Sequence, residues 1–301
     1  MAHLHQQSNE RELDRRLWAS AALNLAITLI EFIGGLWAGS LALLADSVHN
    51  LADVGALGLA IFARRLGKRA PTLRHTYGLK RAEVFAALVN AAVLIAISVL
   101  IAREAVGRLF HPEPVEATVM LISATLALVA NLASVFLLRG HSRQDINVRT
   151  AFLHLLQDAL ASLAVVVAAL LARTQAGLHV DPAVAILVGI VVLRSAVSIA
   201  WESLHTLLEA APPNLDVGQL AGAVAHRFPS IRLHHIHVWE VGPGQRALTA
   251  HMKTGIGSVA EAELAASDLR RYLHERWDID HATLEVEANG CGREEILGEW
   301  R

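Results

Sequence analysis

The sequence predicts a polytopic α-helical membrane protein with six transmembrane helices, followed by a small cytoplasmic α+β domain. Of its 301 residues, 54% are hydrophobic and only 18% are charged. The apolar residues are crowded before about residue 208, and the composition changes at Ala211. We therefore expect a transmembrane domain over residues 1–211 and a soluble domain over residues 212–301.

Six apolar stretches are each near or above the length that a helix needs to cross a bilayer, which is about 20 residues. Glycines and the polar segment HPEP at 111–114 separate them, and polar loops provide the other breaks. The stretches cover approximately residues 16–38, 42–64, 82–108, 116–138, 150–173 and 181–208.

Lysine and arginine residues predict the orientation of these spans, because cytoplasmic loops carry an excess of them. Three precede the first span, seven lie between the second and third spans, and three lie between the fourth and fifth. The opposite side has only Arg103, Arg108 and Arg173. We therefore expect both termini to be cytoplasmic. The polar N-terminus has no pattern typical of a cleavable signal peptide, so insertion is expected to use the first span.

The C-terminal part alternates between helix and strand patterns after a linker at Pro212-Pro213. Helical spacing is followed by two alternating runs joined at Gly242-Pro243-Gly244, then by a second helical run and a third strand. This order, αββαβ, is typical of a compact α+β domain. The expected elements cover 215–228, 231–241, 247–254, 260–277 and 282–287.

Two His-x-x-x-Asp pairs interrupt the apolar sequence. His49 and Asp53 lie in the second span, and His154 and Asp158 lie in the fifth. A four-residue spacing places both side chains of a pair on one face of a helix. Ionisable residues inside a membrane are costly and point to function. One such pair could simply hydrogen-bond between helices, but two pairs at the same spacing favour a metal site.

The two pairs supply two imidazole nitrogens and two carboxylates, a ligand set that suits tetrahedral Zn(II). All four groups bind protons, so metal affinity should depend on pH and metal binding should release protons. The single cysteine, Cys291, excludes an intrachain disulfide and a cysteine-based zinc ribbon. A net charge of −2 gives no indication of nucleic-acid binding. An intramembrane metalloprotease would need HExxH or an equivalent, which the sequence lacks.

The chain resembles the cation diffusion facilitator family over nearly its whole length. The resemblance rests on SLALLADSVHNLAD, on YGLKRAEVFAALVNA at 77–91, on the second His-x-x-x-Asp and on HHIHVWEV, ALTAHM and HATLEVE in the C-terminal part. It implies a homodimeric zinc/proton antiporter with a cytoplasmic metallochaperone-like domain, in which Zn(II) is the substrate and protons are the counter-ion. The lack of a long histidine-rich loop is similar to bacterial members and implies a bacterial inner membrane.

The resemblance also implies further sites. In the basic loop after the second span, Thr72 and Leu79 stand where other members place ligands, so only His75 remains and we expect no strong metal binding there. Arg81 and Glu209 match positions at which members place a charged pair that bridges the dimer. Two solvated charges at helix ends are the alternative.

A regulatory zinc cluster in the cytoplasmic domain is a further implication of the resemblance. Residues two apart on a strand share a face, so His235 and His237 should point one way. By position, the cluster is expected to include His235, His251, Glu285 and Glu287, with Glu263 where some members have histidine. His237 is expected to serve packing, and His234 is expected to face solvent.

Other polar residues in or near the spans have more modest expected roles. Asn50 and Gln157 could orient ligands from the second coordination shell, and Asp46 is expected to form an interhelical hydrogen bond. His179 and Asp181 are expected to be loop residues that face outside. Alternative functions are export of Mn, Fe, Co, Ni or Cd, and a membrane metal sensor that does not transport.

Overall fold

The computed structural model describes residues 22–139, 146–174, 177–255, 257–287 and 295–297. Internal contacts divide the chain into two compact units, which we describe separately. The first contains the described residues up to Gly58 together with Val89–Ile199, and the second contains Leu59–Leu88 and the described residues from Ala200 onward. His3, His5, His141 and Cys291 lie outside the described residues.

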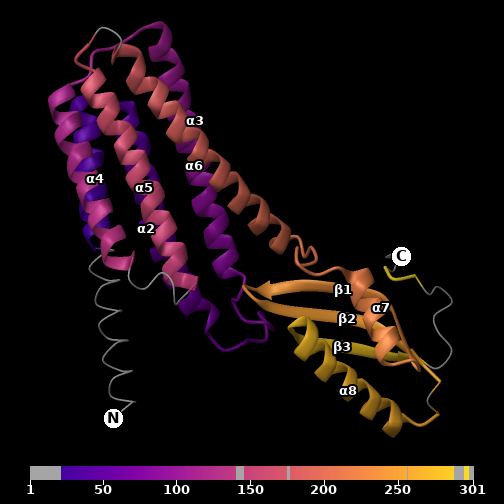
Figure 1. Ribbon diagram of the computed structural model, residues 1–301. Helices are drawn as coiled ribbons and strands as arrows, with labels where there is room; N and C mark the ends of the chain where they lie inside the picture. Colours follow the sequence, from indigo (N-terminus) through magenta and orange to yellow (C-terminus); the bar gives the residue numbers. More distant parts are fainter. Residues whose placement is uncertain (1–21, 140–145, 175–176, 256, 288–294, 298–301) are drawn as a thin grey trace, which may run out of the picture. The chain divides into compact units, whose positions relative to one another are not determined.

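Helices occupy each of the six predicted apolar ranges. An apolar helix over Ala22–Ala38 precedes five longer ones (Figure 1). The longer helices are α2 (Leu41–Gly67), α3 (Ala82–Phe110), α4 (Ala117–Arg139), α5 (Ile146–Leu171) and α6 (Gly177–Leu207). Four of them, α3 to α6, contain segments long and apolar enough to cross a membrane.

Small residues dominate the core of the helical unit. Alanines at 0% exposure occur on α2, α3, α4, α5 and α6, where they form one cluster with Leu43, Met120 and Val165. Small side chains let membrane helices approach closely, because apolar association between helices gains little in lipid. Gly34 shows how close this approach is: a Cβ at this position would lie 2.2 Å from the Ser123 hydroxyl oxygen on α4.

Asp181 corrects the expectation of an outward-facing loop residue. It lies within α6 at 1% exposure, and its carboxylate accepts from three donors at the start of α2. These donors are the Ser40 hydroxyl at 2.5 Å and the backbone amides of Leu41 at 2.9 Å and Ala42 at 3.3 Å. An anion at a helix N-terminus satisfies otherwise unpaired amides. Asp181 therefore links α6 to the beginning of the helix that carries His49.

The second unit contains the sheet, with its elements in the order α7 (Val217–Arg227), β1 (Ile231–Gly242), β2 (Gln245–Thr254), α8 (Val259–Trp277) and β3 (Ile279–Glu287). β1 and β2 form an antiparallel hairpin, and β3 pairs in parallel with β2 (Figure 1). Both helices contribute to one apolar core with alternate sheet residues such as Leu248, Ala250 and Met252. The intervening residues of the strands therefore lie on the opposite, open face.

Candidate metal centres

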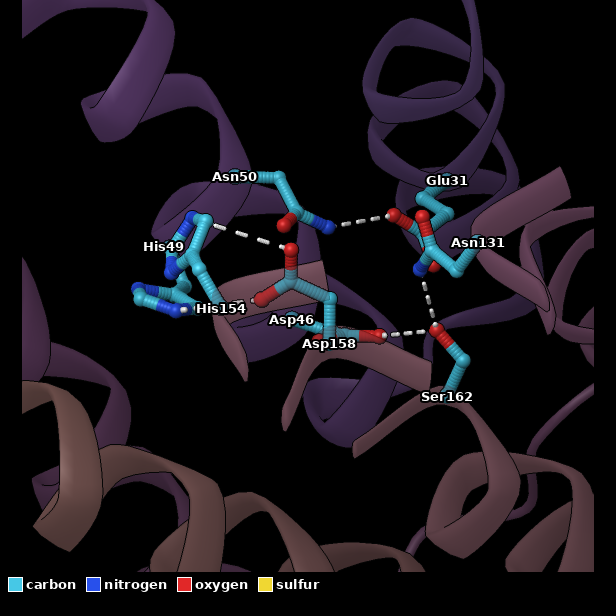
Figure 2. A network of polar contacts seen from close by, with 8 residues as sticks. All are labelled: Glu31, Asp46, His49, Asn50, Asn131, His154, Asp158 and Ser162. Carbon is cyan, nitrogen blue, oxygen red and sulfur yellow. Dashed lines mark hydrogen bonds and ion pairs between the residues drawn. The ribbon is translucent and has the colours of Figure 1, made fainter. Parts of the chain in front are cut away.

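Three of the four predicted membrane ligands lie together in the helical unit. The Asp158 side chain is 0% exposed, and its carboxylate faces two imidazoles (Figure 2). Its Oδ1 is 3.7 Å from His49 Nε2, and its Oδ2 is 3.7 Å from His154 Nε2. The two rings are 6.0 Å apart between centroids and are inclined by 73°. His49 on α2 and His154 on α5 are 105 positions apart in the sequence but lie close together in the structure.

These distances suit a bridging cation better than direct hydrogen bonds. A hydrogen bond between these groups would measure about 2.7–3.2 Å. A nitrogen and an oxygen bound to the same tetrahedral zinc lie about 3.3 Å apart, given metal–ligand bonds of about 2.0–2.2 Å. Small side-chain movements would therefore bring all three groups to coordination distance. Asp53 follows His49 by one helical turn on α2, but its side chain lies outside the described part of the chain.

The polar residues near this centre bond differently from the expected ligand-orienting roles. The Asn50 amide donates to Glu31 Oε2 at 3.1 Å, whereas Gln157 is exposed on α5. Asp46 accepts from the Ser162 hydroxyl on α5 at 3.2 Å, which is the interhelical hydrogen bond expected of it. A second polar layer thus adjoins the imidazole–carboxylate group (Figure 2). Glu31, which belongs to this layer, is a charged residue inside the first apolar stretch.

A second group of potential ligands lies on the open face of the sheet. The strand register aligns His234 with His251 and His251 with Glu285. His251 Nδ1 is 2.7 Å from Glu287 Oε1, and His251 Nε2 is 3.4 Å from Glu285 Oε2. Of the described residues, those with ligand atoms within 4.8 Å of one another are His234, His251 and Glu287.

His234 corrects the prediction that it faces solvent. Its side chain is 3% exposed, and its Nε2 lies 3.1 Å from Glu287 Oε2. The cause is a bulge in β1 between His234 and His237, where His235 has a left-handed φ of 49°. A bulge places two residues of one strand opposite one residue of its partner. The alternation of side chains along β1 is therefore interrupted at the bulge, and both His234 and His235 reach the open face of the sheet.

His235 remains close to this group, with its ring centroid 4.8 Å from that of His251 and 5.2 Å from that of His234. Its amide donates to the Glu295 carbonyl at 3.2 Å, so the C-terminal segment borders the bulge. His237 lies beyond the bulge and is half-buried. Glu263 is exposed on α8, and it is not part of the close group formed by the described residues.

The other predicted residues also have defined positions. His75 is exposed in a turn, where its amide and carbonyl pair with those of Thr72. Arg81 Nη2 donates to Glu209 Oε1 at 2.9 Å within the same chain, and both side chains are partly exposed. An exposed pair of this kind contributes about 0–1 kcal/mol to stability. Whether it bridges two chains stays a prediction.

Comparison with known proteins identifies the family. A family model for the cation efflux transmembrane domain matches residues 17–208. The zinc transporter ZitB of Escherichia coli is 37% identical over 97% of this chain and 94% of its own length. The metal cation efflux system protein CzcD of Cupriavidus metallidurans is 32% identical over 96% of this chain and 90% of its own.

A third relative is named for several metals. The cadmium, cobalt and zinc/H(+)-K(+) antiporter of Bacillus velezensis is 35% identical over 86% of this chain and 83% of its own length. The family model covers more than half of the chain, and the relatives align along nearly all of it. The protein is therefore a multi-pass membrane protein that belongs to the cation efflux family, the cation diffusion facilitators.

Proposed function

We propose that this protein is a secondary transporter that exports Zn(II) from the cytoplasm in exchange for protons. The observation that carries the proposal is Asp158, a buried carboxylate held 3.7 Å from each of two imidazole nitrogens on different helices. Such a group in an apolar helical unit has few roles other than binding a cation or a proton. The names of the relatives support zinc as the substrate.

The ligand chemistry supports exchange with protons. Zn(II) approaches from the cytoplasm and displaces protons from imidazole and carboxylate groups, since only their deprotonated forms bind metal. A rearrangement of α2 and α5 relative to the other helices then exposes the site to the opposite side. There, protons compete for the same lone pairs and favour release. Ligands without thiolate suit this cycle, because nitrogen and oxygen donors hold zinc less tightly than sulfur.

We further propose that the protein has six membrane spans and cytoplasmic termini. It forms a homodimer in the inner membrane of a bacterium. The six helices at the predicted ranges and the excess of basic residues in the predicted cytoplasmic loops support the first two points. In this arrangement the group at His234, His251 and Glu287 is cytoplasmic and binds regulatory zinc. Arg81 and Glu209 lie close to the membrane surface in the same arrangement.

Zinc flux into proteoliposomes driven by a pH gradient tests the transport site. We expect His49→Ala, Asp53→Ala, His154→Ala and Asp158→Ala each to reduce flux at least about tenfold, because each removes a ligand. His179→Ala, at an exposed position on α6, is the matched control and should retain flux. Normal flux in any folded variant of the four would remove that residue from the site.

Competition by Cd(II), Co(II), Mn(II), Fe(II) or Ni(II) in the same assay determines metal preference.

A further inference from the structure

A serine hydroxyl connects three helices next to the transport centre. Ser162 lies on α5 at 0% exposure, and its two partners are Asp46 on α2, at 0% exposure, and Asn131 on α4, at 1% exposure. None of the three belongs to the predicted ligand set, and the transport cycle proposed above uses none of them. Figure 2 shows this network beside Asp158 and the two imidazoles.

The two hydrogen bonds of Ser162 run in series across the three helices. Its Oγ donates to Asp46 Oδ2 at 3.2 Å and accepts from Asn131 Nδ2 at 3.2 Å. A hydroxyl group has one proton and two lone pairs, so it can serve both partners at once. The amide of Asn131 therefore fixes the direction in which the hydroxyl donates. Hydrogen bonds in series strengthen one another and make a buried interface rigid.

The bond between Ser162 and Asp46 lies one helical turn from the ligands on both helices. Asp46 precedes His49 by three residues on α2, and Ser162 follows Asp158 by four residues on α5. At these spacings each side chain shares a helix face with the ligand of its own helix. The bond therefore crosses the same interface between α2 and α5 as the 3.7 Å contact between Asp158 Oδ1 and His49 Nε2. It limits how far the two helices can separate at the transport centre.

The separation of α2 and α5 determines which cation fits between these ligands. Zn(II) forms bonds of about 2.0–2.2 Å to nitrogen and oxygen ligands, whereas Cd(II) is a larger ion and needs longer bonds. Proteins distinguish metals of similar chemistry by the geometry of the site rather than by ligand affinity alone. A hydrogen bond that keeps α2 and α5 close together therefore favours the smaller ion.

We propose that Ser162 is a positioning residue, which acts through Asp46 and is oriented by Asn131, and that it makes the transport centre selective for Zn(II) over Cd(II). The inference rests on the proposed function and extends it to the choice between metals. Ser162 touches no cation in this assignment. Its effect is to hold α5, and with it His154 and Asp158, at a fixed distance from α2.

Calorimetric titration with ZnCl₂ and with CdCl₂ tests this role. It uses the full-length protein in nanodiscs, with His251→Ala in every sample to impair the cytoplasmic group. We expect Ser162→Ala to weaken zinc binding by about tenfold, the factor for the loss of one buried hydrogen bond, and to leave cadmium binding unchanged. Ser47→Ala is the matched control and should bind both metals as before. Ser47 is buried on α2, and its hydroxyl donates within that helix to the Leu44 carbonyl at 2.9 Å.

Asn131→Leu tests whether the amide acts through the serine. This variant removes the group that orients the Ser162 hydroxyl, so it should lower the preference for zinc in the same direction. In a Ser162→Ala background it should have no further effect, because two residues of one hydrogen-bond network are not additive when one acts through the other. An additive effect of Asn131→Leu would contradict the network.

An unchanged preference for zinc in folded Ser162→Ala would overturn the inference. So would equal weakening of zinc and cadmium binding, because a general loss of stability does not distinguish the two ions. If Ser162→Ala does not fold, Asn131→Leu alone decides, and an unchanged preference in that variant overturns the inference. Failure of the proposed function is distinguishable, because the unmodified protein would then bind zinc in preference to cadmium but show no zinc flux in proteoliposomes.

Discussion

At the scale of single residues, the neighbouring histidines His234 and His235 of β1 differ in burial and in backbone conformation. His234 is buried against Glu287, whereas His235 sits at the bulge with a left-handed backbone. A left-handed conformation costs about 1–2 kcal/mol for a residue other than glycine. It persists here because the bulge lets both imidazoles lie near His251. The strain is thus associated with a cluster of potential ligands.

His234→Ala should weaken zinc binding at the cytoplasmic group by at least about tenfold, which corresponds to about 1.4 kcal/mol. The reason is the loss of a buried nitrogen 3.1 Å from Glu287 Oε2. Calorimetry in an Asp158→Ala background, where the membrane site is impaired, measures this affinity. His226→Ala, at an exposed position on α7, is the matched control. Unchanged affinity in His234→Ala would exclude His234 as a ligand.

At the scale of elements, α2 depends on two contacts that hold its beginning in place. Asp181 accepts hydrogen bonds from three groups at its N-terminus, and Gly34 lets the preceding helix approach α4. Both contacts lie far from the ligands in sequence. They determine where α2 begins and how it packs, and hence where His49 faces.

Asp181→Asn should lower the free energy of unfolding by about 1–2 kcal/mol, because it removes a charged acceptor from the N-terminus of α2. Thermal unfolding followed by intrinsic fluorescence in detergent measures the change. His179→Gln, two residues away and exposed, should have little effect. Equal melting temperatures for Asp181→Asn and the unmodified protein would show that Asp181 does not stabilise the helix.

Gly34→Ala should destabilise the helical unit by about 1–3 kcal/mol, because overpacking displaces neighbouring atoms. Its new Cβ would meet the Ser123 Oγ at 2.2 Å and Cβ at 2.9 Å. Gly107→Ala on α3 is the matched control, since nothing lies within 4 Å of its added Cβ. The same unfolding assay compares them. A melting temperature of Gly34→Ala equal to that of Gly107→Ala contradicts the close contact.

At the scale of the whole molecule, the chain combines a helical unit that exposes large apolar side chains with a unit that contains the sheet. Large apolar side chains are exposed along α3 to α6, among them Leu100, Phe136, Leu170 and Ile190. Such exposure is costly in water and favourable in lipid. The sheet unit instead buries its apolar residues in a core of its own. The two candidate ligand groups therefore lie in units that bury their apolar residues differently.

Zinc binding by the whole protein should weaken as pH falls, because protons and metal compete for the same ligands. Free imidazole takes up a proton near pH 6.5, and its protonated form has no lone pair for a metal. Affinity should therefore be greatest above that range and decrease below it, by about tenfold per pH unit for each proton that zinc displaces. Radioactive zinc binding between pH 5.5 and 8 measures the slope. A flat profile would exclude proton competition at the binding sites.

The apolar pattern predicts the helices, and the paired His-x-x-x-Asp spacing indicates the candidate ligands, because hydrophobic burial and helix periodicity are local properties. The close approach of His49 and His154 to Asp158 required the packed helices. Two further features depended on contacts between distant segments: the burial of His234 and the capping role of Asp181. A bulge breaks strand alternation, and the tertiary partner decides whether a buried carboxylate caps a helix. None of these follows from local periodicity.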